Sequence, residues 1–144
     1  MKKLSIVIVI VALVYVYAQE QGISIHDLAS FSSRADTALE EAYAKRRSDL
    51  QVKGAGTVTK VLADDLDGSR HQKFILKMSN GQTLLVAHNI DLAPRIEGLR
   101  TGDTVEFYGE YEWNPKGGVI HWTHHAPNND HVGGWLRHAG RTYQ

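Results

Sequence analysis

From Val52 onward the chain consists of short runs with β-strand patterning that are separated by turns. This alternation of strands and turns restricts the fold more than any other feature. Glycine-containing and acidic turns separate the runs at a spacing typical of small barrels. The predicted strands are residues 54–62, 71–78, 83–87, 104–113 and 119–125. Three strands, a crossover with a proline and a final hairpin follow the order of an OB-type barrel. We therefore predict a mainly β protein with a five-stranded OB-like barrel.

Turn chemistry and residue alternation indicate which strands pair and which faces are buried. The Asn80-Gly81 pair favours the positive φ of a tight hairpin, so the second and third strands should pair directly. Along residues 104–113, large apolar side chains alternate with polar ones, and the alternating apolar set should face the core. This predicted core set contains Val105, Phe107, Tyr111 and Trp113.

The first 18 residues have the parts of a secretory signal. Lys2 and Lys3 precede an apolar run over residues 4–17, and Val16 and Ala18 occupy the positions that a signal peptidase reads. The run is shorter than the roughly 20 apolar residues that span a bilayer comfortably. We therefore predict cleavage after Ala18 and a periplasmic or secreted protein. The alternative is that the segment is retained as a membrane anchor.

The rest of the chain divides into a helical connecting region, residues 19–50, and a domain, residues 51–144. A helix is predicted over residues 34–48, because alanine and leucine recur there at helical spacing and basic residues follow. The segment from Ala126 onward is predicted to be a loop-like tail. Because the chain contains no cysteine, the domain must be held together by packing alone.

Charge excludes one common class of partner. The full chain has 16 basic and 16 acidic residues, and loss of Lys2 and Lys3 leaves 14 against 16, a net charge of −2. Strong binding to duplex DNA, which needs many basic contacts to phosphates, is not expected. Seven of the eight histidines lie beyond residue 70, so this part of the chain should become cationic in a mildly acidic compartment.

Three polar segments, residues 88–94, 111–118 and 120–125, read HNIDLAP, YEWNPKGG and IHWTHH. Barrel patterning alone does not dictate such strings. They resemble a family of small exported bacterial proteins described as a domain of unknown function, and the resemblance covers about residues 52–143. It implies export and a small β domain, and it implies no particular activity.

The histidines suggest a divalent metal site, with zinc ahead of other metals. In an OB-type barrel the third and fifth strands lie side by side and run in the same direction, which brings their ends together. Imidazoles and a carboxylate converging from separate strands are typical of zinc sites with an open position. The predicted ligands are His88, Asp91, His121 and His124. The alternative, that these side chains cap backbone groups, stays open.

Two glutamates of the fourth strand are candidates for acid–base chemistry, together with His71. Glu110 and Glu112 share one face, and the register of the last hairpin decides what they meet. One register places them beside Ile120, Trp122 and His124, whereas a slip of one residue places them beside His121 and Thr123. The alternative is that both glutamates simply lie on a solvated outer face of the barrel.

Tyr108, Trp122 and Asn89 are predicted to contact a ligand, which is anionic, a saccharide or an oligonucleotide. The chain has no Gly-x-Ser-x-Gly, phosphate-cradling loop or HExxH motif, so covalent catalysis is not expected. The first functional hypothesis is an exported binding module with a histidine-rich edge. The alternatives are a metal-dependent exported hydrolase, such as a nuclease or phosphodiesterase, and a structural partner in an envelope complex.

Overall fold

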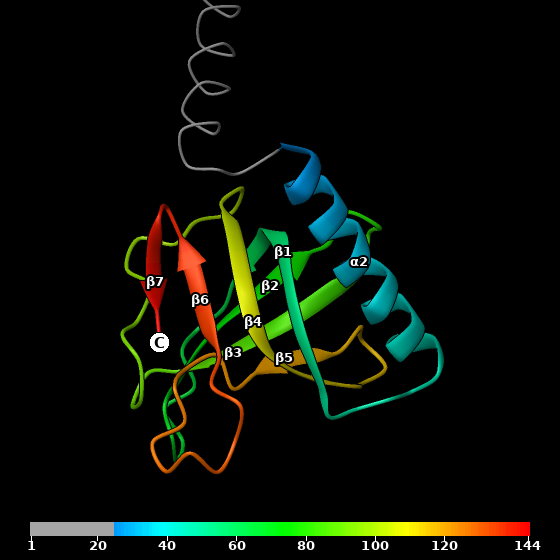
Figure 1. The fold of residues 1–144 in the computed structure, drawn as a ribbon. Helices are drawn as coiled ribbons and strands as arrows, with labels where there is room; N and C mark the ends of the chain where they lie inside the picture. The colour runs from blue at the N-terminus through cyan, green and yellow to red at the C-terminus, as the bar shows by residue number, and fades with distance from the viewer. Residues whose placement is uncertain (1–24) are drawn as a thin grey trace, which may run out of the picture. The chain divides into compact units, whose positions relative to one another are not determined.

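The structure of the protein is a computed structural model that describes residues 25–144. These residues form one helix and seven strands (Figure 1). In chain order they are α2 (Ile25–Ala44), β1 (Leu50–Val61), β2 (His71–Lys77), β3 (Thr83–Asn89), β4 (Thr104–Glu112), β5 (Val119–His121), β6 (Trp135–His138) and β7 (Arg141–Tyr143). The predicted signal segment, residues 1–18, lies outside the described part of the chain.

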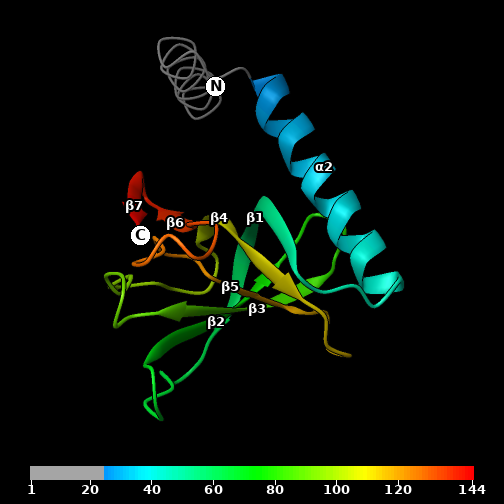
Figure 2. The ribbon, with the colours of Figure 1, turned by 60° about the horizontal axis from the view of Figure 1, so that its bottom comes forward.

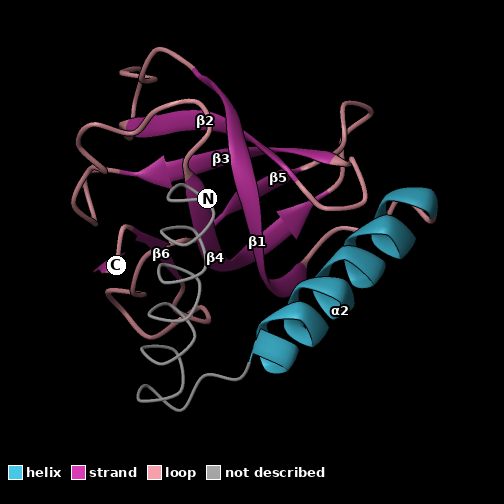
Figure 3. Ribbon diagram, turned by 90° about the horizontal axis from the view of Figure 1, so that it is seen from above, coloured by secondary structure: helices cyan, strands magenta, loops and turns pink. Residues whose placement is uncertain are grey.

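Strands β1 to β5 close into a barrel. They follow the order β1-β2-β3-β5-β4, and β1 also pairs with β4 to complete the circle. Strands β3 and β5 are parallel, and the other neighbours in the barrel are antiparallel (Figure 2). The crossover from β3 to β4 contains turns and no helix (Figure 3). The predicted mainly β fold, with a five-stranded OB-like barrel and a helix before it, is confirmed.

Strand β1 closes the barrel by pairing with two partners in succession. Its residues 50–57 pair with β4, and its residues 57–61 pair with β2. Gly54 and Gly56 lie on the buried face of the first part, where an added Cβ would stand 2.8 Å from the Phe107 ring and 3.0 Å from the Lys77 carbonyl oxygen respectively. Small residues are therefore needed where β1 bends across the core.

The core follows the predicted alternation. Along β4 every second side chain is buried, and Val105, Phe107 and Tyr111 are fully enclosed. Trp113 lies just beyond the strand and packs against the core while partly exposed. The opposite face of β4 carries its polar side chains toward the outside, which is the face on which the glutamates lie.

The helix differs from its predicted bounds of 34–48. It starts at Ile25 and ends at Ala44. The helix ends there because Arg46 adopts a left-handed conformation with a φ of 52°. The amide of Arg47 then donates to the Ala42 carbonyl at 2.9 Å, which is the bond of a Schellman motif. Residues 33–44 belong to the same compact unit as the barrel. Leu39 is fully buried, so this half of the helix packs against the core.

The segment predicted as a loop-like tail from Ala126 is a loop only to residue 134, and residues 135–143 form a β-hairpin. Strand β6 pairs with residues 105–108 of β4, and β7 pairs with β6. Leu136 and Tyr143 are buried and supply the apolar contact that holds the hairpin in place. The predicted fifth strand is also shorter than residues 119–125, because Trp122 has a positive φ of 53° and ends the ladder at His121.

Two strands consequently share one edge of β4. Strand β5 pairs with residues 110–112, whereas β6 pairs with residues 105–108. Gly109 lies between these two stretches, and a Cβ there would stand 2.5 Å from the His121 carbonyl oxygen. The connection between β5 and β6, residues 122–134, therefore begins and ends beside Gly109 at the edge of β4.

This crowding predicts a large effect of one methyl group. We expect Gly109→Ala to lower the free energy of unfolding by about 1–3 kcal/mol, because the added carbon forces β5 away from β4. Gly133→Ala is the control, since its Cβ would meet nothing closer than 3.6 Å, and we expect a change within about 1 kcal/mol. Urea denaturation of both variants measures the difference. Equal stability of the two would contradict the close approach.

Candidate metal centre

Two glutamates and a histidine meet on the outer face of the β4–β5 hairpin. In the observed register Glu110 lies opposite His121, and Glu112 lies opposite Val119. Side chains two residues apart on a strand share a face, so the two carboxylates and the imidazole point to the same side. Of the two registers that the sequence left open, the protein adopts the one that brings the glutamates to His121.

The spacing of these three groups suits a metal ion. His121 Nε2 lies 3.3 Å from Glu110 Oε1 and 3.6 Å from Glu112 Oε1. One ligand atom from each residue lies within 4.8 Å of the other two. Ligand atoms that surround a tetrahedral zinc ion at about 2.0–2.1 Å stand about 3.4 Å from one another. The two distances from His121 are close to that value.

His121 Nε2 is a buried atom with no hydrogen-bond partner among the described residues. The carboxylates approach it at ion-pair distance, yet neither has the geometry of a hydrogen bond. Leaving a buried polar atom without a partner costs free energy, so such an atom calls for an explanation. A cation bound between the imidazole and the two carboxylates would give His121 Nε2 a partner, and these three ligand groups fit a divalent metal ion.

A second histidine, His131, holds Glu110 from the other side. Its Nε2 lies 2.5 Å from Glu110 Oε2, and its Nδ1 lies 2.7 Å from the Val132 carbonyl oxygen. A carbonyl oxygen and a carboxylate oxygen both accept hydrogen bonds, so these two contacts favour the protonated form of the ring. Burial lowers the pKa of His131, but the hydrogen bonds to Val132 and Glu110 outweigh it, and the pKa is raised. A ligand carboxylate that is itself hydrogen-bonded is typical of metal sites.

The loop that carries His131 is held by Trp122. The His131 ring stacks on the indole with 3.9 Å between ring centroids and an interplanar angle of 6°. His124 contacts the same indole in a tilted arrangement at 5.2 Å. The loop can return so closely because residue 134 is a glycine, where a Cβ would stand 2.1 Å from the Trp122 carbonyl oxygen. Positive φ at Trp122 and the glycine at 134 thus bring His131 to Glu110.

A hollow of about 220 Å³ lies beside the cluster and shares His121 with it. It brings together five of the residues predicted from the sequence, namely His71, Asn89, His121, Trp122 and His124. His71 Nδ1 donates to the Ser69 carbonyl oxygen at 2.7 Å, and His124 Nδ1 donates to the carbonyl oxygen of the next residue at the same distance. The parallel pairing of β3 and β5 brings Asn89, His121 and His124 to this hollow, whereas His88 and Asp91 are not among the described residues that line it.

His88, one of the predicted metal ligands, lies apart from this group. It is fully buried inside the barrel. Its Nδ1 bonds to the Thr123 hydroxyl at 2.8 Å, and its Nε2 bonds to the Pro94 carbonyl oxygen at 3.0 Å. A neutral ring that donates from Nε2 and accepts at Nδ1 satisfies both contacts. Burial is the main reason that the pKa of His88 falls to about 4.

Asp91 and Tyr108 are also placed away from the cluster. Asp91 accepts the Arg70 amide at 2.8 Å and the Arg70 guanidinium at 2.6 Å, and these bonds lower the pKa of Asp91. Tyr108 lies on the outer face of β4 against Trp135, with 6.3 Å between ring centroids. Each of these two side chains therefore has a protein partner, and neither belongs to the Glu110–Glu112–His121 group.

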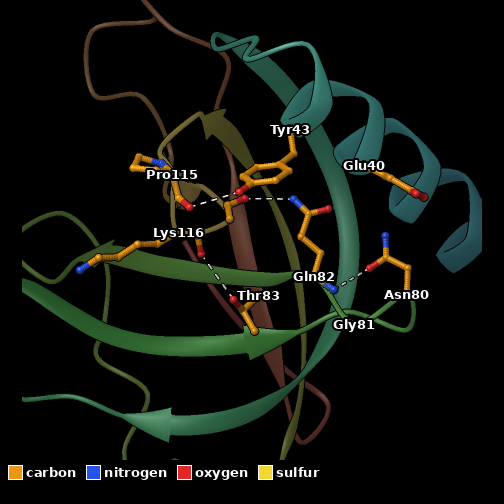
Figure 4. Close-up of a pocket in the computed structure, with 9 residues that line it drawn as sticks. Glu40, Tyr43, Asn80, Gly81, Gln82, Thr83, Pro115 and Lys116 are labelled. Carbon is orange, nitrogen blue, oxygen red and sulfur yellow. Dashed lines mark hydrogen bonds between the residues drawn. The ribbon is translucent and has the colours of Figure 1, made fainter.

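A larger hollow, of about 390 Å³, lies between the second half of α2 and the turns of the two hairpins (Figure 4). Its polar side chains bond within its own lining. Tyr43 Oη donates to the Pro115 carbonyl oxygen at 3.2 Å, and Gln82 Nε2 donates to the Gly117 carbonyl oxygen at 3.0 Å. Among the described residues, no histidine lines it and no group of side chains suited to a metal ion lies there. We therefore regard the Glu110–Glu112–His121 group as the stronger candidate.

No pattern in the sequence predicted a role for His131. It follows Glu110 by 21 residues and lies in a segment that has no strand patterning. The only signal was the concentration of histidines beyond residue 70. Which of those histidines reaches a carboxylate depends on how the loop between β5 and β6 folds back.

Fold and site together define a small closed β-barrel, OB-like in strand order, with a Glu-Glu-His group on its outer face. The chain belongs to the family described as Protein of unknown function (DUF3465), whose model matches residues 23–144. A comparison with curated proteins gives no match. Within the described residues, no helix has the length and apolar character needed to cross a membrane.

The environment of His88 predicts a specific pH dependence. The unfolded imidazole titrates near pH 6.5 and the folded one near pH 4, so the stability that the neutral ring contributes is complete above pH 6.5. It should be lost as the pH falls from about 6.5 to about 4, and the full loss corresponds to about 3 kcal/mol. Urea denaturation between pH 4 and 7 measures this slope. In His88→Gln the slope should be flatter, and an unchanged slope would refute the assignment.

Proposed function

We propose that this protein is an exported binding module that holds one divalent metal ion through Glu110, Glu112 and His121. The observation that carries the proposal is the buried Nε2 of His121, which faces two carboxylates and makes no hydrogen bond within the described part of the chain. An imidazole nitrogen and two carboxylate oxygens are common ligands of divalent metals.

The donor set favours a borderline metal over a hard one. Calcium and magnesium prefer sites made of oxygen ligands, whereas an imidazole suits zinc and its neighbours. Zinc is the first metal that we propose, because it accepts three protein ligands and leaves a fourth position for another group. Glu110, Glu112 and His121 are all partly exposed, so an ion held there has access to solvent.

A metal-dependent hydrolase is the second candidate. The observation that favours it is the hollow beside His121, which adds His71 and His124 to the neighbourhood of the proposed ion. A metal ion with an open position can activate water, and an imidazole can accept the proton. Turnover of a substrate separates this candidate from a module that only binds.

Export is proposed from the pattern of residues 1–18, which has the basic, apolar and small-residue parts of a secretory signal. The family match begins at residue 23, after this segment. A periplasmic or secreted location suits a domain that contains no cysteine to be oxidised.

Removal of one ligand should abolish tight metal binding. We expect the wild-type protein, freed of metal with EDTA, to bind one zinc ion in a calorimetric titration. Glu112→Gln should weaken this binding at least about 100-fold, because it removes a charged ligand and leaves the fold intact. Elemental analysis of the purified protein should show the same difference in metal content.

Glu97→Gln is the matched control, because the Glu97 side chain is 82% exposed and its ion pair, to Arg95 at 3.4 Å, lies outside the proposed site. It should bind zinc as the wild type does. If zinc, manganese and calcium all fail to bind the wild-type protein, the metal-binding proposal is wrong.

His131 should tune the same site without being a ligand. We expect His131→Phe to lower zinc affinity about 10- to 100-fold, because Glu110 loses the hydrogen bond that orients it while the ring stacked on Trp122 is kept. His138→Phe is the control, since it breaks a similar bond to Asp103 on another part of the barrel. Equal zinc affinity in all three proteins would exclude the orienting role.

A further inference from the structure

The hollow beside the metal ligands has walls from three strands of the barrel. His71 of β2 lies opposite Asn89 of β3 in the ladder, and Ala87 precedes Asn89 on the same face. Strand β5 runs parallel to β3 and adds His121 as the next wall. His124 closes the hollow from the loop that follows β5. The walls are therefore fixed mainly by the sheet.

The polar groups of these walls are oriented by bonds to the backbone. His71 and His124 each use Nδ1 on a carbonyl oxygen, which leaves Nε2 for another partner. Asn89 accepts the Asp91 amide through Oδ1 at 2.9 Å, which leaves its Nδ2 group to donate. Ser69 belongs to the same lining. The Asn89 amide can donate to an oxygen atom of a ligand, and each imidazole can do so from Nε2 in its protonated form.

The charge around the hollow favours an anion. No carboxylate is among the described residues that line it. Asp91, the nearest acid along the chain from Asn89, is neutralised by the Arg70 guanidinium at 2.6 Å. Glu110 and Glu112 approach His121 and would be neutralised by a bound divalent ion. A negatively charged ligand would thus meet hydrogen-bond donors and a metal ion, and it would not be repelled by uncompensated carboxylates.

We infer that this hollow binds a small ligand through a phosphoryl or carboxylate group, placed between His71, Asn89 and His124 and next to the metal ion. The inference rests on the proposed function, because the metal is taken as the neighbouring positive charge. The volume of about 220 Å³ is below the roughly 300 Å³ at which pockets for drug-sized ligands begin, so the ligand is small or only one end of it enters.

Phenyl phosphate is a suitable probe, and its binding can be followed by NMR titration of the whole protein in zinc-loaded and EDTA-treated form. We expect zinc to strengthen binding about tenfold or more. His71→Asn and His124→Asn keep a group that donates to the same carbonyl oxygen and lose Nε2. Each substitution should weaken the binding of phenyl phosphate at least about fivefold, while the zinc affinity stays within about twofold of the wild-type value. His125→Asn, an exposed neighbour outside the lining, should change neither.

The two proposals fail in different ways. Suppose that zinc binds but that phenyl phosphate binds the wild type, His71→Asn and His124→Asn with equal affinity. The oxyanion inference is then overturned and the metal site stands. The same conclusion follows if an uncharged methyl glucoside binds more tightly than phenyl phosphate. If zinc does not bind, the metal proposal fails, and the EDTA-treated protein decides the inference by whether His71→Asn binds more weakly than the wild type. Release of phenol only from the zinc-loaded protein would support the inference and the hydrolytic candidate.

Discussion

The structure depends on how closely β5 and β6 approach the same edge of β4. Gly109 separates the two stretches of β4 that they pair with, and a side chain there would collide with the β5 backbone. Gly134 allows the returning chain to pass within contact of Trp122. Close backbone packing is what glycine permits inside a sheet. The hairpin register, the loop that carries His131 and the position of the glutamates all follow from this junction.

The same junction concentrates charge on one side of the barrel. Glu110 is the most enclosed of the three proposed ligands, and it is held between His121 and His131, whose pKa is raised. Two carboxylates in such proximity repel each other unless a cation lies between them, and one imidazolium compensates only part of that charge. This imbalance is the electrostatic reason for placing a divalent ion at the group.

Strand periodicity separates histidines of identical chemistry into different roles. His88 points into the barrel, where both of its nitrogens have protein partners and burial keeps it neutral. His71 of β2 and His121 of β5 point outward from the two strands that flank β3, and both line the hollow. Because successive side chains on a strand face opposite sides, Ala87 and Asn89, the neighbours of His88 in β3, also face outward. Sequence proximity to other histidines therefore says little about which of them form a site.

The sequence by itself determined the barrel, because alternation along β4, the Asn80-Gly81 turn and the strand spacing depend on local geometry. It also indicated that β3 and β5 would run side by side, although the β3 residue that lines the hollow with His121 and His124 is Asn89 and not the predicted His88. Only the tertiary structure decided the hairpin register, the Glu110–His131 contact and the β6–β7 hairpin. These depend on long-range packing at Gly109 and on a left-handed Trp122, and no local sequence preference specifies either.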